Sequence, residues 1–442
     1  MRARYLILLP LLLCAALPAK AARPLSLADA IMLARQNRSD LKQAQIDLER
    51  ADLNLLRAKL ERIHLTIQGG ASIQAQDLNT QLTGTASGAN PICALTPSQC
   101  DNQSHTYGGQ ADLTIPIWSG FTVEADIERA RWLARASQAQ AKGTVRTIAL
   151  DVVRAYWAVR RAELLREVEA EAVRRDQEIE EIVSRRVRAG IAPQVDLNRV
   201  HVATLREQGT LLGLDGQLGE ARAQLAAVLQ IDDEIVLTED PHAHTPLVPP
   251  LEVAMDEARG ARPELLAARA QVLAQAEAVR SARGGYWPQL QLFGHVDVRN
   301  ANSVFTAVPT EELFSNAWAG GRALWTLFDT LSTWAQVRDA EYQRVRLEAD
   351  SSRIRFQVDA DVRAAHVRLS RALAQRAPLD QSEKVARDNL EIIQKRYQAG
   401  DALILDLLDA QVQLLRSQSD LVDNSVTIAQ AEAELQSALG RL

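Results

Sequence analysis

The sequence is poor in aromatic residues, cysteine and methionine, and it has no excess of basic charge. Aromatic residues make up 4% of the 442 residues, and there are three cysteines and three methionines. The formal charge of −6 argues against a general nucleic-acid binder, which needs a basic surface. Beyond the N-terminus no run of about 18 apolar residues occurs, so no spanning helix is expected there. A hydrophobic content of 47% excludes wholesale disorder, and abundant Ala, Leu, Gln, Arg and Glu favour long helices over an enzyme core.

The N-terminus has the organisation of an export signal. Arg2 and Arg4 precede a short apolar stretch from Leu6 to Leu17, and Ala19-Lys20-Ala21 offers a small-x-small cleavage site. We therefore expect residues 1–21 to be a signal peptide that is removed on export.

Export would place the two remaining cysteines in an oxidising compartment. Cys93 and Cys100 are close enough in the chain to form a local loop disulfide, Cys93–Cys100. Metal binding is the alternative, but two cysteines without a nearby partner pair make a poor zinc site. His242 and His244 likewise have no third ligand close in sequence, so neither a metal nor another cofactor is expected.

The chain beyond the signal consists of two similar halves. Arg186-Val187-Arg188-Ala189-Gly190 returns 210 residues later as Arg396-Tyr397-Gln398-Ala399-Gly400. Apolar positions seven apart follow each glycine at the same offset, which indicates an internal repeat of packed helices. The predicted organisation is a first repeat over 22–240, a Pro-rich linker over 241–250 and a second repeat over 251–442.

Each half is predicted to run helix, strand, loop, strand, very long helix, turn, helix. Helical periodicity covers roughly 27–61 and 251–283, and the very long helices cover roughly 120–189 and 329–399. A helix of about 70 residues would be about 105 Å long, more than a compact soluble domain needs. Pro378 is expected to kink or break the second long helix.

Four segments alternate apolar and polar residues, as outer-membrane strands do. Because four strands cannot close a barrel, and open edges in lipid would leave backbone groups unpaired, the barrel must be shared between subunits. Three copies would give twelve strands around a lumen. The alternative is two amphipathic hairpins on a soluble sheet. The four segments are about 63–74, 107–118, 288–299 and 317–328, joined within each pair by long polar loops.

These features together resemble the TolC-like outer-membrane efflux protein family over essentially the whole mature chain. Tyr286-Trp287-Pro288-Gln289-Leu290 looks like the family's entry into a strand, and Trp325-Thr326-Leu327-Phe328-Asp329 like its exit from the barrel. The first half has Ile63-His64-Leu65 at the entry, without the proline. The resemblance implies a mainly α protein with a membrane β-barrel: a homotrimeric, twelve-stranded β-barrel in outer-membrane lipid, continued by a twelve-helix α-barrel in the periplasm.

The same resemblance implies a function and partners. Members are passive exit ducts of tripartite efflux or type I secretion systems, and they dock to a periplasmic adaptor (membrane fusion protein) and an inner-membrane pump. We find no nucleophile elbow, no phosphate loop and no paired zinc ligands in the sequence, so no motif argues for an enzyme. A periplasmic coiled-coil scaffold or adaptor without a barrel remains the alternative, and the four strands distinguish the two. The exported substrate is not determined by this chain.

The helical tips hold the candidate site residues. Asp406 and Asp409 lie three apart on one helix face, and six such carboxylates in a trimer would form a cation-selective ring at the pore entrance. By resemblance they match the family's acidic ring. The alternative is an acidic first turn favoured by the helix dipole, and Asp196 at the equivalent position of the first half is compatible with it.

The resemblance also assigns tip closure and docking. Tyr397 and Asp196 match a tyrosine and an acid that tie the two coils together. Ala402 stands where the family has a lock arginine, so either the closed state is less stable or Arg396 or Arg186 substitutes, and the sequence does not decide between these alternatives. The turn residues Gly190 and Gly400 are expected to adopt a left-handed conformation, and by resemblance their turns form the adaptor-docking surface.

Overall fold

A computed structural model describes residues 23–75, 103–231, 235–241, 246–300 and 313–442. The signal peptide, Cys93, Cys100, His242 and His244 lie outside the described residues, so the expectations for them stay predictions.

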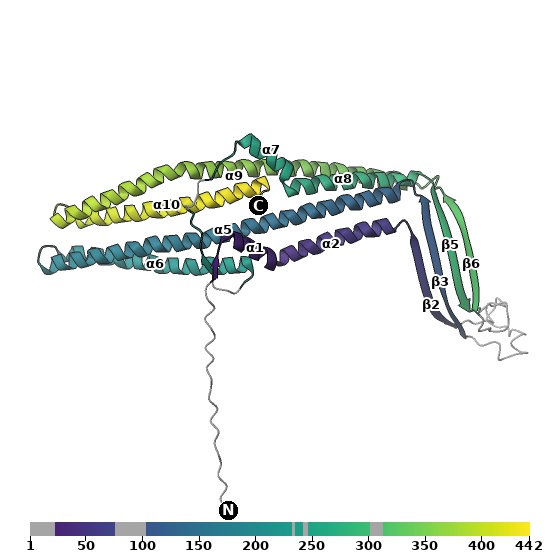
Figure 1. The fold of residues 1–442 in the computed structure, drawn as a ribbon, viewed down its shortest axis with the longest axis horizontal. Coiled ribbons are helices and arrows are strands. Elements are labelled where there is room, and N and C mark those ends of the chain that lie inside the picture. The colour runs from purple at the N-terminus through teal and green to yellow at the C-terminus, as the bar shows by residue number, and fades with distance from the viewer. Residues whose placement is uncertain (1–22, 76–102, 232–234, 242–245, 301–312) are drawn as a thin grey trace, which may run out of the picture. The chain divides into compact units, whose positions relative to one another are not determined.

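The two halves have the same order of long elements, as the sequence predicts (Figure 1). Among the described residues, each half has two shorter helices, two long strands, one very long helix and one further helix, and the first half also has two three-residue strands. The first half comprises β1 (Arg23–Leu25), α1 (Leu27–Asn37), α2 (Ser39–Leu60), β2 (His64–Ala75), β3 (Gln103–Trp118), α5 (Thr122–Arg188), α6 (Gln194–Leu229) and β4 (Ile235–Leu237). The second comprises α7 (Leu251–Ala261), α8 (Pro263–Arg283), the 3₁₀ turn η2 (Gly284–Tyr286), β5 (Gln289–Asn300), β6 (Leu313–Leu324), α9 (Ser332–Ala399) and α10 (Ile404–Leu439).

The first helix of each half is broken once, at equivalent arginines. Arg38 separates α1 from α2 and Arg262 separates α7 from α8, and both residues are extended, with ψ of 123° and 121°. At Arg262 the following Pro263 disfavours the helical conformation of the residue before it. The single helices expected over 27–61 and 251–283 are therefore each two helices.

Pro378 does not break α9, which runs from Ser332 to Ala399 with the proline inside it. The sequence predicts a kink or a break at Pro378, and the break does not occur. A proline in a helix interior removes one hydrogen bond and crowds the preceding turn. The free-energy cost of this change is small compared with the free energy gained by packing a helix of 68 residues.

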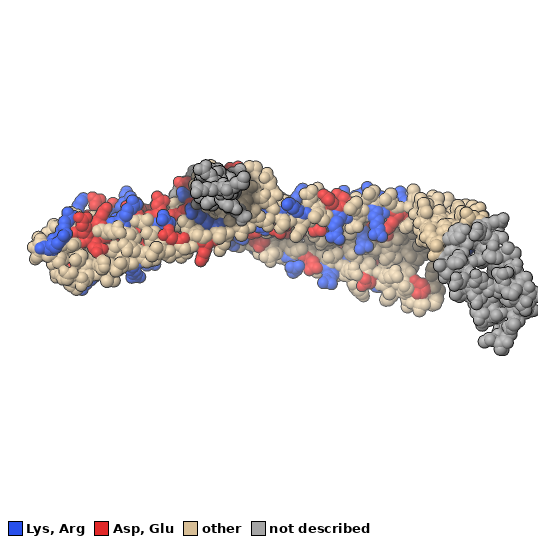
Figure 2. Space-filling view, turned by 90° about the horizontal axis from the view of Figure 1, so that it is seen from below, with Lys and Arg blue, Asp and Glu red and all other residues tan. Residues whose placement is uncertain are grey.

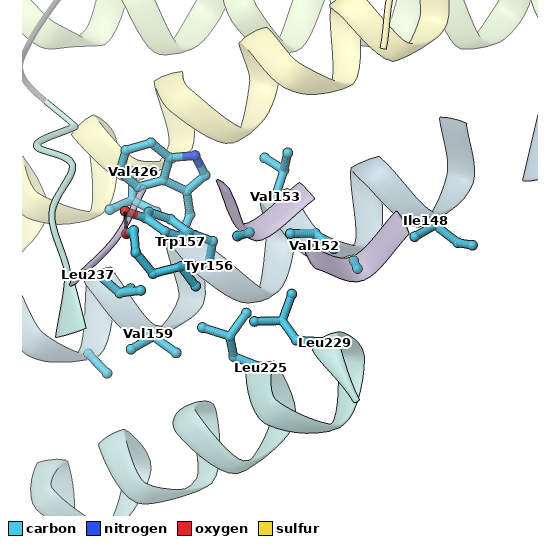
Figure 3. Packing of buried hydrophobic residues seen from close by; sticks show 14 of the residues in the cluster. Ile148, Val152, Val153, Tyr156, Trp157, Val159, Leu225, Leu229, Leu237 and Val426 are labelled. Atoms are coloured by element: carbon cyan, nitrogen blue, oxygen red, sulfur yellow. Dashed lines mark hydrogen bonds between the residues drawn. The ribbon is translucent and has the colours of Figure 1, made fainter. Parts of the chain in front are cut away.

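The described chain divides into two compact units that cut across the repeats. The first contains residues up to 43, 142–262 and 357–442, and the second contains 44–141 and 263–356. The core of the first unit joins α5, α6, α10 and the short parallel pair β1–β4 (Figure 3). Tyr156 on α5 is fully buried there, and its hydroxyl donates to the Leu25 carbonyl oxygen at 3.1 Å.

Polar side chains from the short helices cap the C-terminal ends of α6 and α10 in this first unit. Asn37 donates from its amide to the Leu229 carbonyl oxygen at the end of α6. At the end of α10, the guanidinium of Arg262 donates to the carbonyl oxygens of Ser437 and Ala438 and to the carboxylate of Asp361 at 3.2 Å. The last carbonyls of a helix have no partner within it, so these side chains supply donors that the helix lacks. The Ser437 carbonyl oxygen also accepts from the Gly440 N–H and from Arg146.

The second unit holds a four-stranded antiparallel sheet in the order β2-β3-β5-β6. The outer strands β2 and β6 each pair on one side in this sheet. The last strand lies four residues earlier than predicted, at Leu313–Leu324. Trp325 follows the end of β6 at Leu324. Its indole N–H donates to the Tyr286 carbonyl oxygen at 3.2 Å.

Two successive residues with positive φ connect the sheet to each long helix. They are Gly120 and Phe121 before α5, and Thr330 and Leu331 before α9, again 210 residues apart. A Cβ at Gly120 would lie 2.7 Å from the Gly284 carbonyl oxygen, so close approach of η2 also requires glycine there.

Charged side chains of both signs are interspersed along the helices on the face seen in Figure 2. Many of them form pairs three or four residues apart, such as Arg344 with Glu348. Such exposed pairs each contribute only about 0.5 kcal/mol or less to helix stability. Within the described segments, no helix combines the length and the apolar character that crossing a membrane requires.

Candidate functional sites at the helical tips and on the sheet

The two tips of the first unit are turns with the same hydrogen-bond pattern. Gly190 has φ of +71° and its N–H donates to the Val187 carbonyl; Gly400 has φ of +89° and its N–H donates to the Tyr397 carbonyl. In each turn the next N–H reaches back to an arginine carbonyl of the long helix at 2.9 Å. Both glycines have the left-handed conformation that ends a helix at low conformational cost.

Tyr397 lies at the centre of the tip contact. Its side chain is 6% exposed and belongs to a cluster from α5, α6, α9 and α10. Arg186 donates from its guanidinium to the Tyr397 carbonyl oxygen at 2.5 Å, and the guanidinium carbon lies 4.9 Å from the ring centroid. Burial raises the pKa of the Tyr397 hydroxyl, Arg186 lowers it and Asp196 raises it. The charges of Arg186 and Asp196 thus both act on Tyr397.

The other predicted tip residues begin the return helices. The Asp406 carboxylate accepts a hydrogen bond from the Leu403 N–H at 3.2 Å, which caps the start of α10. Asp409 is exposed one turn further on. Asp196 lies in the first turn of α6, with its carboxylate 3.7 Å from Arg199. An acid in a first turn is stabilised by the helix dipole, so Asp406 has a structural role whatever else it does.

The position that the resemblance assigns to a lock arginine holds Ala402. Ala402 is half-buried and packs against the tip cluster. Arg396 donates to the Asp401 carbonyl oxygen within its own turn at 3.2 Å. Of the two arginines named as substitutes, Arg186 therefore reaches across to the other coil and Arg396 does not.

The sheet of the second unit has one apolar and one polar face. Residues opposite each other on antiparallel strands share a face. Leu65, Leu113 and Leu292 lie on the apolar face, and Thr66, Asp112, His295 and Trp318 form one row across the polar face.

Histidine and carboxylates interact along that polar face. His295 Nδ1 lies 2.6 Å from Asp112 Oδ1, and His295 Nε2 lies 3.5 Å from Asp297 Oδ1. The Trp318 ring is 5.3 Å from the His295 ring. A shallow depression of about 360 Å³ next to this group is floored by Gly69, Gly70, Gly108 and Gly109 and edged by His295, Asp297 and Arg299. No group of three or more acidic, histidine or cysteine side chains in the described chain has metal-binding geometry.

Comparison with known proteins identifies the family. The model of the family described as outer membrane efflux protein matches residues 30–229 and 254–441. The chain belongs to the outer membrane efflux protein family.

Solved structures with this fold cover nearly all of the efflux protein. CusC is 15% identical, with a TM-score of 0.77 over 94% of this chain and 92% of CusC. The outer membrane protein VceC of Vibrio cholerae is 18% identical, with a TM-score of 0.74 over 94% and 96% of the two chains. The open-state MtrE channel of Neisseria gonorrhoeae is also 18% identical, at 0.74 over 94% and 88%. At these identities the likeness establishes the fold.

One curated relative matches part of the efflux protein. The fusaric acid resistance protein FusA of Burkholderia cepacia is 26% identical over 204 residues. The match covers 45% of this chain and 37% of that relative, so the chain matches little more than a third of the relative's length.

Two groups of side chains in the efflux protein are not among the residues predicted from the sequence. The row Asp112, His295, Trp318 depends on strand register, which the sequence does not specify. The second group is a buried acidic pair on α5, Glu169 and Asp176. Its signal was available, because both acids occupy positions where the seven-residue apolar pattern of α5 calls for apolar side chains.

Proposed function

We propose that the protein is an outer-membrane exit duct of a tripartite export system. The observation that carries this proposal is the family match over both repeats, combined with a four-stranded sheet that has one apolar and one polar face. An apolar face suits lipid and a polar face suits a water-filled lumen. We infer a passive conduit rather than an enzyme.

The barrel is completed by copies of the chain. The outer strands β2 and β6 present unpaired backbone edges, which lipid does not tolerate. Pairing of β6 with β2 of the next copy would satisfy both edges, and three copies would give a twelve-stranded homotrimer wide enough for a lumen. The apolar face would then meet outer-membrane lipid, and Asp112, His295 and Asp297 would line the duct.

The periplasmic entrance is assigned to the two tips. The carboxylates of Asp406 and Asp409 would form a ring that attracts cations. Asp196, Arg186 and Tyr397 would hold the two coils together in the closed state, and the turns at Gly190 and Gly400 would receive a periplasmic adaptor coupled to an inner-membrane pump. Adaptor binding would open the duct if the adaptor binds the separated tips more tightly than the closed ones.

One relative suggests which cargo to test first. FusA is named for resistance to fusaric acid, an organic acid. We therefore propose efflux of small organic compounds, with type I protein secretion as the alternative within the duct class.

Planar-bilayer conductance, measured together with the oligomeric mass of the same detergent-extracted sample, tests the proposal. A trimer that forms discrete, cation-preferring pores is the expected result. A protein that stays in the aqueous phase without detergent and forms no pores, even when the tip acids are neutralised, would instead support a periplasmic scaffold.

A further inference from the structure

Two acidic side chains interrupt the apolar seam of α5. Ala162, Glu169, Asp176 and Val183 follow one another seven residues apart, and all four are buried. Glu169 is 5% exposed and Asp176 is 6% exposed. Apolar side chains at this spacing stabilise helix packing, whereas a buried carboxylate costs free energy unless it is neutral or paired. The two acids therefore need either partners or protons.

Their neighbour on α6 is a third acid. The charge of Glu207 acts on both Glu169 and Asp176. Like charges near one another in partly buried positions favour protonation of at least one of the carboxyl groups. The cation that acts on Asp176 is Arg175, which also reaches Gln418 on α10 at 3.5 Å. One arginine cannot neutralise three carboxylates.

A further member of the cluster is Gln411 on α10. Its side chain is 8% exposed, and neither its Nε2 nor its Oε1 has a hydrogen-bond partner among the described residues; the same holds for Glu169 Oε1. The Gln411 amide faces Asp176 closely enough to lower the pKa of that carboxyl. No group of three His, Cys, Asp or Glu side chains among the described residues has metal-binding geometry. A buried carboxylate that lacks a paired cation lowers its cost of burial by binding a proton.

The electrostatics of the cluster agree with this geometry. Burial, with further contributions from Glu207 and Asp176, raises the pKa of Glu169 to about 7. Burial and Glu207 raise the pKa of Asp176 to about 6, and Arg175 and Gln411 oppose this rise. Both groups therefore bind protons more tightly in the packed state than in water. The packed state is most stable at low pH, and that advantage is lost progressively as the pH rises from the ordinary carboxyl range through about 6 and 7.

The second repeat shows what this seam looks like without acids. The positions 210 residues further on lie in α9. Leu379, equivalent to Glu169, is half-buried, and Ala386, equivalent to Asp176, is buried. Apolar residues therefore suffice for packing in the equivalent helix, and the chain itself supplies the matched substitutions Glu169→Leu and Asp176→Ala.

We propose that Glu169, Asp176 and Glu207 bind protons as one site, and that release of these protons loosens the contact of α5 and α6 with α10. The ionised carboxylates draw water into the seam, because burial without protons leaves their charges unpaired. The proton site stands on the cluster alone. Only its consequence, an entrance that opens more easily at alkaline pH, rests on the exit-duct function proposed above.

Infrared spectroscopy of the full-length protein in detergent tests the site directly. The wild type is expected to show a protonated-carboxyl C=O band that disappears with a midpoint between about 6 and 7. Glu169→Gln should remove part of this band, and Glu169→Leu with Asp176→Ala should remove it. The control Glu167→Gln, at an exposed position of the same helix, should leave it unchanged. A wild type without a titrating band, or a band that persists in the double variant, overturns the proposal.

Hydrogen exchange tests the mechanical consequence. After correction for the intrinsic rate, protection of the α10 amides around Gln411 should fall on the order of tenfold between about pH 5 and about pH 8 in the wild type. It should be independent of pH in the double variant and in Glu169→Gln with Asp176→Asn, which keeps the shape of the side chains. PH-independent protection in the wild type contradicts the loosening. Bilayer conductance of the same samples is a separate readout. If the carboxyl band titrates but the protein forms no pores, the proposed duct function is contradicted and the proton site is supported.

Discussion

The guanidinium of Arg186 lies over the ring of Tyr397 and donates to that residue's backbone carbonyl oxygen. This contact joins the end of the first long helix to the end of the second, at residues that are 211 apart in the chain. Arg186 is half-buried and Tyr397 is buried, so water competes only partly for the contact.

Replacing Arg186 should therefore make the closed tip less stable. Arg186→Ala removes the hydrogen bond and the cation–π contact, together about 1 kcal/mol at a half-buried site, which raises the ratio of open to closed channels about fivefold. Single-channel recording gives this ratio directly. Arg185→Ala, at the exposed neighbouring position, is the control. Equal open probabilities for both variants would show that Arg186 does not stabilise the closed tip.

Neutralising the tip acids should weaken binding of cations at the entrance. Asp406→Asn with Asp409→Asn is expected to reduce block by multivalent cations applied from the periplasmic side, because carboxylate rings attract them. Asparagine at 406 still caps the start of α10, so folding should be retained. Asp380→Asn with Asp388→Asn, at exposed positions of α9, makes the same change in net charge and serves as the control. Unchanged block in the double variant would contradict the assignment of Asp406 and Asp409 to a carboxylate ring at the entrance.

Arg262 should be among the residues most important for stability. Arg262→Met leaves the Ser437 and Ala438 carbonyls and the half-exposed Asp361 without this guanidinium, at a cost of about 2 kcal/mol. Thermal unfolding followed by circular dichroism measures the loss. The equivalent Arg38 forms a local pair with the partly exposed Asp40, so Arg38→Met should cost less than about 1 kcal/mol. Equal losses would show that capping of α10 is not what Arg262 contributes.

Two glycines with similar φ should respond differently to alanine. At Gly120 the added Cβ would lie 2.7 Å from the Gly284 carbonyl oxygen and 2.8 Å from the Trp287 Cβ, whereas at Gly190 nothing lies within 4 Å. Gly190→Ala should cost about 1 kcal/mol from the left-handed backbone alone, and Gly120→Ala at least about twice that. Thr330 adopts φ of +56° at the position equivalent to Gly120, so the close approach, rather than φ, makes glycine necessary there. Equal costs in thermal unfolding would contradict this.

The sequence by itself determined the element order, the duplication and the alternation of the strands. These features are periodic: a period of two or of seven residues is set by local geometry and can be read along the chain. The glycines of the tip turns were predictable for the same reason, since the left-handed ends of the long helices are local conformations.

Only the tertiary structure decided which side chains meet. The row of Asp112, His295 and Trp318 depends on strand register, and Arg186 meets Tyr397 because two coils pack side by side. The continuity of α9 through Pro378 was decided by packing, which outweighs local propensity in long helices. The break at Arg262 has a local cause in Pro263, whereas the equivalent break at Arg38 occurs without a proline. Glu169 and Asp176 interrupt the seven-residue apolar pattern of α5 in the sequence, but only the structure shows that both are buried and that the half-buried Glu207 on α6 acts on them. The physical reason is the same throughout: periodicity is local, whereas burial, register and partner choice come from residues far apart in the chain.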